Sequence, residues 1–179
     1  MRSVLDEFDI SKIKWLNEHV LPLWVYGTLR TEERFHYYLQ GCSDKVGEYQ
    51  MDGTLMQTAS GDVYVVKTGT ERKTMGELYR VSLSGLWRIF HLENQSGSFP
   101  KAYDLSASKI FETTTGHMRV ALWFRRLEDE ALPISDFKMR KTLLQSLLEN
   151  FENKEPNLPQ NDVDHFLSEW LSKQSERCC

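Results

Sequence analysis

The sequence predicts an α+β fold. Short strand-like segments separated by glycines fill the middle of the 179-residue chain, and helical patterns occupy both ends. The length lies within the range of one domain and is enough to bury a hydrophobic core. No internal repeat or low-complexity linker divides the chain. We therefore expect a single domain over residues 1–179.

The N-terminal third is predicted to hold a helix, a strand and a turn. Asp9 to His19 has the periodicity of an amphipathic helix, and Pro22 to Tyr26 is a short apolar segment typical of a buried strand. Thr31 to Leu39 is expected to form a short helix or turn that Thr31 begins. The aromatic side chains of this last segment are expected in the core: Phe35, Tyr37 and Tyr38.

The middle of the chain is predicted to form a meandering sheet followed by one helix. Glycines separate three strand candidates, Tyr49 to Met56, Val63 to Val66 and Met75 to Val81. Apolar residues at three- and four-residue spacing then predict a helix over Leu83 to Glu93. These are Leu83, Leu86, Trp87 and Phe90.

Two more strands and two helices complete the prediction. Lys101 to Phe111 and His117 to Leu127 are strand candidates, and the second is apolar on both faces, which indicates burial on both sides. An apolar stripe from Phe137 to Phe151 predicts a helix, and a last helix is expected from about Asp162. The two helices are expected to pack on the sheet or on each other.

The segment Trp24 to Arg30 carries the most specific functional signal. Gly27 ends an apolar strand without placing a side chain in the space beyond it. A turn of this kind presents backbone N–H groups to an anion or to a carbonyl oxygen. The sequence therefore predicts a ligand-binding turn here.

Two motifs together resemble the γ-glutamylcyclotransferase-like family, which includes the AIG2-like proteins. The first is Tyr26-Gly27-Thr28-Leu29 after its strand, and the second is Gly76-Glu77-Leu78-Tyr79 followed by the helix that ends at Glu93. The resemblance implies a small mixed β-barrel with surrounding helices. It covers a core over residues 21–127, so residues 1–20 and 134–179 would be helical additions.

The resemblance also implies a reaction and a set of site residues. In this family the α-amine of a γ-glutamyl amine or peptide attacks the side-chain carbonyl and releases 5-oxoproline, without a metal or a cofactor. Glu93 matches the general acid and base. The substrate-binding residues implied are Tyr26, Gly27, Thr28, Leu29 and Tyr103. Independently of the family, Glu93 extends an apolar helix stripe, where partial burial would raise its pKa; a solvated glutamate in the last turn is the other interpretation.

Three functional classes stay open at this point. Phe90 and Asn94 stand where relatives commonly carry aspartate and glycine. These departures keep open a binding or regulatory protein without turnover, which would use the same site for a small ligand or the added helices for a protein partner or a homodimer. Thiol chemistry by Cys42 with His36 or His91 is a third class.

Charge and composition exclude several partners. The net charge is −4 and the basic residues are interspersed with acids, so no surface for nucleic acid is expected. No apolar run is long enough to span a bilayer, and the acidic N-terminus does not resemble a signal peptide, so we expect a cytoplasmic protein. Neither the three cysteines nor the five histidines show the spacing of a metal site. Cys178-Cys179 is expected to be an untethered tail.

Overall fold

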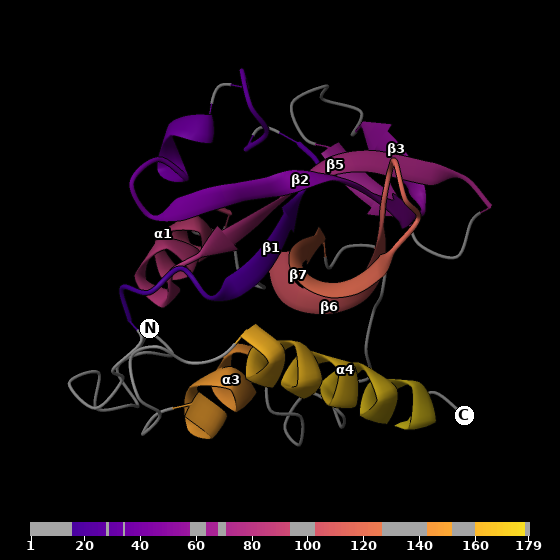
Figure 1. Cartoon of the computed structure of the whole chain (residues 1–179). Coiled ribbons are helices and arrows are strands. Elements are labelled where there is room, and N and C mark those ends of the chain that lie inside the picture. The colour runs from indigo at the N-terminus through magenta and orange to yellow at the C-terminus, as the bar shows by residue number, and fades with distance from the viewer. Residues whose placement is uncertain are drawn as a thin grey trace.

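A computed structural model describes residues 16–27, 29–33, 35–57, 64–67, 71–93, 103–126, 143–151 and 160–177. A β-barrel forms one layer, and two C-terminal helices form a second layer beneath it (Figure 1). The α+β prediction and the mixed barrel are confirmed. The helix expected over Asp9 to His19 lies mostly outside the described residues.

Five strands close the barrel in the order β1-β5-β2-β6-β7. All neighbours are antiparallel except β1 and β7, which run parallel where Leu23 faces Leu122. This one parallel pair closes the barrel and makes it mixed. The strands span Leu21–Val25 (β1), Ser43–Asp52 (β2), Lys73–Val81 (β5), Tyr103–Glu112 (β6) and Met118–Arg126 (β7).

The predicted meander is wrong in its connections. β5 lies between β1 and β2, so strands far apart in sequence are paired. The strand expected over Tyr49 to Met56 is two strands, because the chain leaves β2 at Gly53, whose N–H donates to the carbonyl of Arg72 at 2.7 Å. The chain continues into β3 (Thr54–Gln57), which pairs with β4 (Tyr64–Lys67) in a separate two-stranded sheet.

Alternate residues of the barrel strands build two hydrophobic clusters. The inner cluster contains Trp24 and Tyr26 from β1 and the residue that follows it, together with Tyr49, Met51, Leu78, Ile110, Ala121 and Trp123. The outer cluster takes the opposite faces of the strands and joins them to the helices. Val120 to Phe124 are all buried, so β7 is covered on both faces, as its sequence predicted.

The helix predicted over Leu83 to Glu93 is confirmed as α1 (Leu83–Glu93). Ser82 caps its N-terminus, because the Ser82 hydroxyl accepts the N–H of Gly85 at 3.0 Å. The segment expected to form a short helix or turn from Thr31 to Leu39 does so: its described residues form turns, beginning at Thr31, and one 3₁₀ helix, η3 (His36–Tyr38). Phe35 and Tyr38 pack against the outer cluster as expected, but Tyr37 is exposed.

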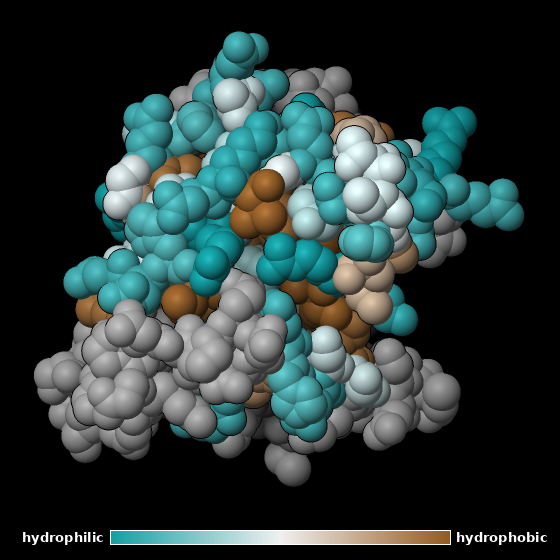
Figure 2. Space-filling view, viewed as in Figure 1, coloured by the Kyte–Doolittle hydropathy of each residue, from teal (hydrophilic) through white to brown (hydrophobic). Residues whose placement is uncertain are grey.

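Two C-terminal helices cover β6 and β7. They are α3 (Leu143–Phe151), which contacts β6, and α4 (Gln160–Arg177), which contacts both strands. Leu147 of α3 and Leu167 of α4 belong to the outer cluster, and apolar atoms are visible along the seam above α4 (Figure 2). Arg119 of β7 and Asp164 of α4 form an ion pair at 3.9 Å across this seam. Within the described ranges, no helix is long and apolar enough to cross a membrane.

Gly76 provides a test of how tightly the barrel is packed. A Cβ atom at this position would lie 2.5 Å from Cε2 of Trp24 and 2.5 Å from the carbonyl oxygen of Val25. Since this oxygen belongs to the backbone of the paired strand and cannot move aside as a side chain could, Gly76→Ala would push β1 away from β5. We expect the free energy of unfolding to fall by about 1–3 kcal/mol, measured by urea denaturation.

Gly47→Ala in β2 is the matched control. A Cβ atom there would lie 3.7 Å from Cε2 of Tyr49, which is an ordinary contact. We expect its unfolding free energy to stay within about 0.5 kcal/mol of wild type. Equal stability of the two variants would contradict the close packing of Trp24 against Gly76.

Candidate functional site

Tyr26, the first residue of the signature motif, is part of the barrel interior. Its side chain is buried, and its hydroxyl donates to the carbonyl oxygen of Phe124 in β7 at 2.8 Å. Its ring stacks on Trp24, with centroids 5.3 Å apart, and meets Trp123 edge-on at 6.1 Å. Tyr26 therefore ties the end of β1 to β7 and supports the turn that follows.

The turn after Tyr26 is held by its own backbone and by one side chain. The N–H of Arg30 donates to the carbonyl of Gly27 at 3.1 Å, and Leu29 is buried in the outer cluster. Nδ1 of His36 lies 2.9 Å from the carbonyl oxygen of Leu29. Because a carbonyl can only accept, this nitrogen carries the proton. Thr28 lies outside the described residues.

The last turns of α1 contact β7, the strand to which Tyr26 is hydrogen-bonded. The Phe90 ring stacks on Trp87, with centroids 5.5 Å apart, and lies 6.3 Å from the ring of Phe124. Phe124 thus contacts both Tyr26, through its carbonyl, and Phe90, through its ring. Glu93 is the last residue of α1, one turn beyond Phe90, and its side chain lies outside the described part of the structure.

Tyr103 is the first residue of β6 and pairs with Arg126, the last residue of β7. This register places its backbone two residue pairs from Phe124, which pairs with Leu105. The Tyr103 side chain is not among those described. The end of β7, Phe124 to Arg126, therefore contacts Tyr26 through a hydrogen bond, Phe90 through a ring contact and Tyr103 through strand pairing.

A buried carboxylate that the sequence analysis did not select lies behind the turn. Glu77 of β5 is 4% exposed and pairs with Val25, the last residue of β1. Its Oε1 accepts the N–H of Thr31 at 2.6 Å, and its Oε2 accepts Nζ of Lys45 at 2.9 Å. The hydroxyls of Thr31 and Tyr79 each lie 3.2 Å from Oε1 and 3.0 Å from each other.

These partners keep Glu77 ionised. Burial by itself would raise the pKa of Glu77, but the hydrogen bonds from Lys45 and from Thr31 outweigh it and hold the pKa below its usual value. The same contact raises the pKa of Lys45, and burial raises the pKa of Tyr79. Glu77 is therefore a fixed negative charge at neutral pH.

The segment between the turn and η3 contains one unfavourable backbone conformation. Glu32, directly after Thr31, has φ of 70°. This left-handed conformation costs a residue with a Cβ atom roughly 1–2 kcal/mol. Such a residue persists where its surroundings determine the backbone, and here Thr31 is bound to Glu77 on its N-terminal side.

Two residues with positional roles were missed from the sequence, Glu77 and His36. Glu77 served only to align a strand, although a carboxylate inside the apolar run Met75 to Val81 was itself a signal, since buried acids need partners. His36 was considered only with Cys42. The Cys42 thiol donates to the carbonyl of Tyr38 at 3.2 Å, and Nδ1 of His36 bonds to Leu29, so these contacts give no support to a thiol–imidazole pair.

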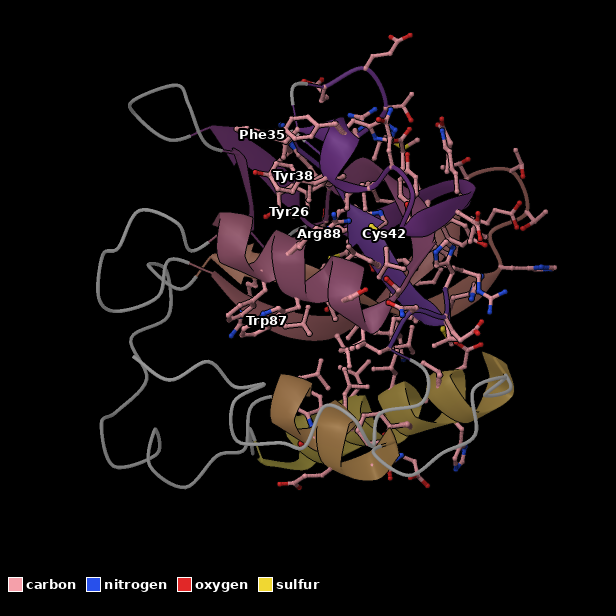
Figure 3. All side chains as sticks on the ribbon, turned by 90° about the vertical axis from the view of Figure 1, so that its left-hand side faces the viewer. Tyr26, Phe35, Tyr38, Cys42, Trp87 and Arg88 are labelled. Atoms are coloured by element: carbon pink, nitrogen blue, oxygen red, sulfur yellow. The ribbon has the colours of Figure 1, made fainter. Side chains whose placement is uncertain are left out.

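The labelled side chains show how the neighbouring elements are arranged around α1. Phe35 and Tyr38, from the segment around η3, lie on one side of this helix, and Trp87 lies on the opposite side (Figure 3). In the described part of the chain, no group of three or more potential ligand side chains could hold a metal ion. Asp164 pairs with Arg119, and His165 pairs with Glu169 at 3.1 Å.

Comparison with known proteins identifies the family. The model of the family "Gamma-glutamyl cyclotransferase, AIG2-like" matches residues 23–137. The chain belongs to this family. The matched region runs from within β1 past β7, so it contains α1 and all of the barrel except the first two residues of β1, whereas α3 and α4 lie beyond it.

Solved structures share the fold of this family member. An AIG2-like protein from Mus musculus has a TM-score of 0.50 and 16% identity, over 70% of this chain and 86% of its own. A protein from Arabidopsis thaliana has a TM-score of 0.50 and 10% identity, over 73% of this chain and 87% of its own. A comparison with curated proteins found no match. At these identities the likeness is one of fold.

The contacts of Glu77 predict a specific pH dependence of stability. Because the pKa of Glu77 is lowered in the folded state, its contribution to stability is present above the ordinary value of 4.5 and is lost as pH falls through the folded-state pKa. Glu77→Gln should lower the free energy of unfolding by about 1–3 kcal/mol at pH 7. The difference from wild type should narrow below pH 4.5, measured by urea denaturation across pH. A constant difference would show that the ionised carboxylate is not what stabilises the fold.

The hydroxyl of Tyr26 provides a second test. Tyr26→Phe should lower the free energy of unfolding by about 1–2 kcal/mol, because the buried carbonyl of Phe124 loses its donor. Thermal denaturation measures the change. Tyr37→Phe, at a residue that is 57% exposed, should have almost no effect. Equal stability of the two variants would mean that Tyr26 does not join β1 to β7.

Proposed function

We propose that this chain is a γ-glutamyl cyclotransferase that releases 5-oxoproline from a small γ-glutamyl amine or peptide, with Glu93 as general acid and base. The family match supports the fold and the reaction class. The observation that carries the proposal is the shared contact at Phe124, which relates the end of β1 to the last turns of α1. The proposed reaction needs a substrate-binding turn close to a catalytic carboxylate, and these two elements carry the candidates for both.

The reaction needs little beyond positioning and proton transfer. The substrate contains both its nucleophile and its electrophile, so folding it into the ring-closing shape supplies the proximity. Glu93 would take a proton from the α-ammonium group. The freed amine would attack the γ-carbonyl carbon, and the amide bond to the leaving amine would break as Glu93 returns the proton to that nitrogen. The second proton, which the attacking nitrogen loses on becoming the ring amide, would also pass through Glu93 to the leaving amine, which departs as an ammonium ion. The products are 5-oxoproline and an amine, and no water is consumed.

The turn after Tyr26 would supply the remaining interaction. Backbone N–H groups of Gly27, Thr28 and Leu29 are the proposed donors to the substrate carboxylate or to the oxygen that becomes negative. Donors that are fixed before the reaction stabilise such an oxygen without rearranging. The bonds that hold Leu29 and Thr31 support this role, because they leave the turn few alternative conformations. Tyr103, at the start of β6, is proposed to contact the substrate.

A protein without turnover is the second candidate, and Phe90 favours it. Relatives commonly carry aspartate here, whereas Phe90 is buried between Trp87 and Phe124. A polar side chain one turn from Glu93 has thus been replaced by a buried aromatic side chain. The fold could then bind a small γ-glutamyl ligand without converting it.

The reaction is tested with Glu93→Gln. We expect wild type to release 5-oxoproline from at least one member of a panel of γ-glutamyl amines and peptides, measured by chromatography. The variant should lose at least about 10²-fold in kcat, since general acid–base catalysis contributes about 10²- to 10⁴-fold. Its thermal stability should stay close to that of wild type.

Glu149→Gln, an exposed carboxylate near the end of α3, is the control and should keep full activity. Full activity of Glu93→Gln would exclude Glu93 as the acid and base. If wild type releases nothing from the panel yet binds one of its members in calorimetry, the non-catalytic candidate replaces the enzyme.

A further inference from the structure

We infer that Glu77 is a positioning residue, whose carboxylate holds the segment after the signature turn in the conformation that binds substrate. The inference rests on the proposed function for its kinetic consequence. Its structural part concerns only Glu77, Thr31 and the turn, and it can be measured without any activity.

The position of Glu77 in the barrel suits this role. It pairs with Val25, so it stands beside the point where β1 ends and the chain turns away. Gly76 faces the barrel interior under Trp24, and alternation along the strand places Glu77 on the opposite, outer face. On that face it meets Thr31, which follows the turn by two residues.

The contacts of Glu77 exceed what burial alone requires. Oε1 binds both the backbone N–H and the hydroxyl of Thr31, so Glu77 fixes the main chain as well as a side chain. Tyr79 bonds to the same oxygen, and Lys45 neutralises the other one. Glu48 faces Glu77 from β2, and Lys45 also lies 3.9 Å from it, which limits the repulsion between the two carboxylates.

The backbone on both sides of Thr31 points to the same role. On the C-terminal side Glu32 is in the left-handed region, a conformation that needs outside support. On the N-terminal side His36 holds the carbonyl of Leu29, and its ring lies 5.9 Å from that of Tyr79. Glu77 and His36 therefore hold successive parts of one segment. Glu77 is the anchor that carries a negative charge.

The test compares Glu77→Met, which removes the acceptor, with Glu77→Gln, which keeps a neutral acceptor of the same shape. Amide hydrogen exchange is followed by NMR at pH 7, well below the melting temperature of each variant. We expect the Thr31 amide to exchange about tenfold or more faster in Glu77→Met and less so in Glu77→Gln. The exchange rates of amides in the centres of β5 and β7 should change only in proportion to the change in global stability.

Glu48→Gln is the matched control, because it also removes a carboxylate beside Lys45 but does not touch Thr31. It should leave the exchange of Thr31 unchanged. If Thr31 is unaffected in Glu77→Met, or quickens only in proportion to the β5 and β7 amides, Glu77 does not position the segment and the inference is overturned.

Kinetics separate this inference from the proposed function. With an active wild type, kcat/KM should fall by about tenfold in Glu77→Met and partly recover in Glu77→Gln, while Glu48→Gln stays at the wild-type value. An unchanged kcat/KM in Glu77→Met would overturn the link to substrate binding. An inactive wild type with locally faster exchange at Thr31 would refute the reaction and uphold the positioning of the segment by Glu77.

Discussion

The close approach of Trp24 to Gly76 is the contact on which the barrel depends. A five-stranded barrel has a narrow interior, and the indole of Trp24 fits there because Gly76 of the facing strand has no side chain. From this position Nε1 of Trp24 donates to the carbonyl of Tyr49 at 3.0 Å, so β1 is bound to β2 across the intervening β5. The place where β1 ends, and hence where the signature turn begins, follows from this contact. The next residue of β5, Glu77, then binds the far side of the same turn.

Much of this arrangement could be predicted from the sequence, because it depends on local patterns. The period of Leu83, Leu86 and Phe90 predicted the bounds of α1, and the alternation in β7 predicted its burial on both faces. The order of the strands could not be predicted, since the pairing of β1 with β5 joins residues that are 52 to 60 positions apart. The role of Glu77 was hidden for the same reason. Its partners Thr31 and Lys45 come from other segments, and no spacing along the chain brings them together.

Glu77 and the proposed catalytic residue Glu93 illustrate how surroundings can suit two similar groups to different tasks. Glu77 has a cation, a backbone donor and hydroxyls around it, and its lowered pKa makes it a poor proton acceptor at neutral pH. Proton transfer requires a carboxylate with a higher pKa, which is the condition proposed for Glu93 at the end of an apolar helix face. A charge that never changes can hold a structural element, whereas a charge that changes during each turnover could not do so without disturbing it.

The C-terminal helices have a consequence for how the family fold can be reused. Val120, Leu122 and Phe124 share one hydrophobic cluster with Leu147 and Leu167 of helices that lie beyond the family match. β7, the strand that accepts the hydrogen bond of Tyr26, is thus covered by helices that lie outside the region matched by the family model. Substitutions in the barrel and in the helices must therefore compensate for each other, because a change on either side of this shared cluster alters the packing of the other side. A graft of the family region into another scaffold would have to bring this covering layer with it.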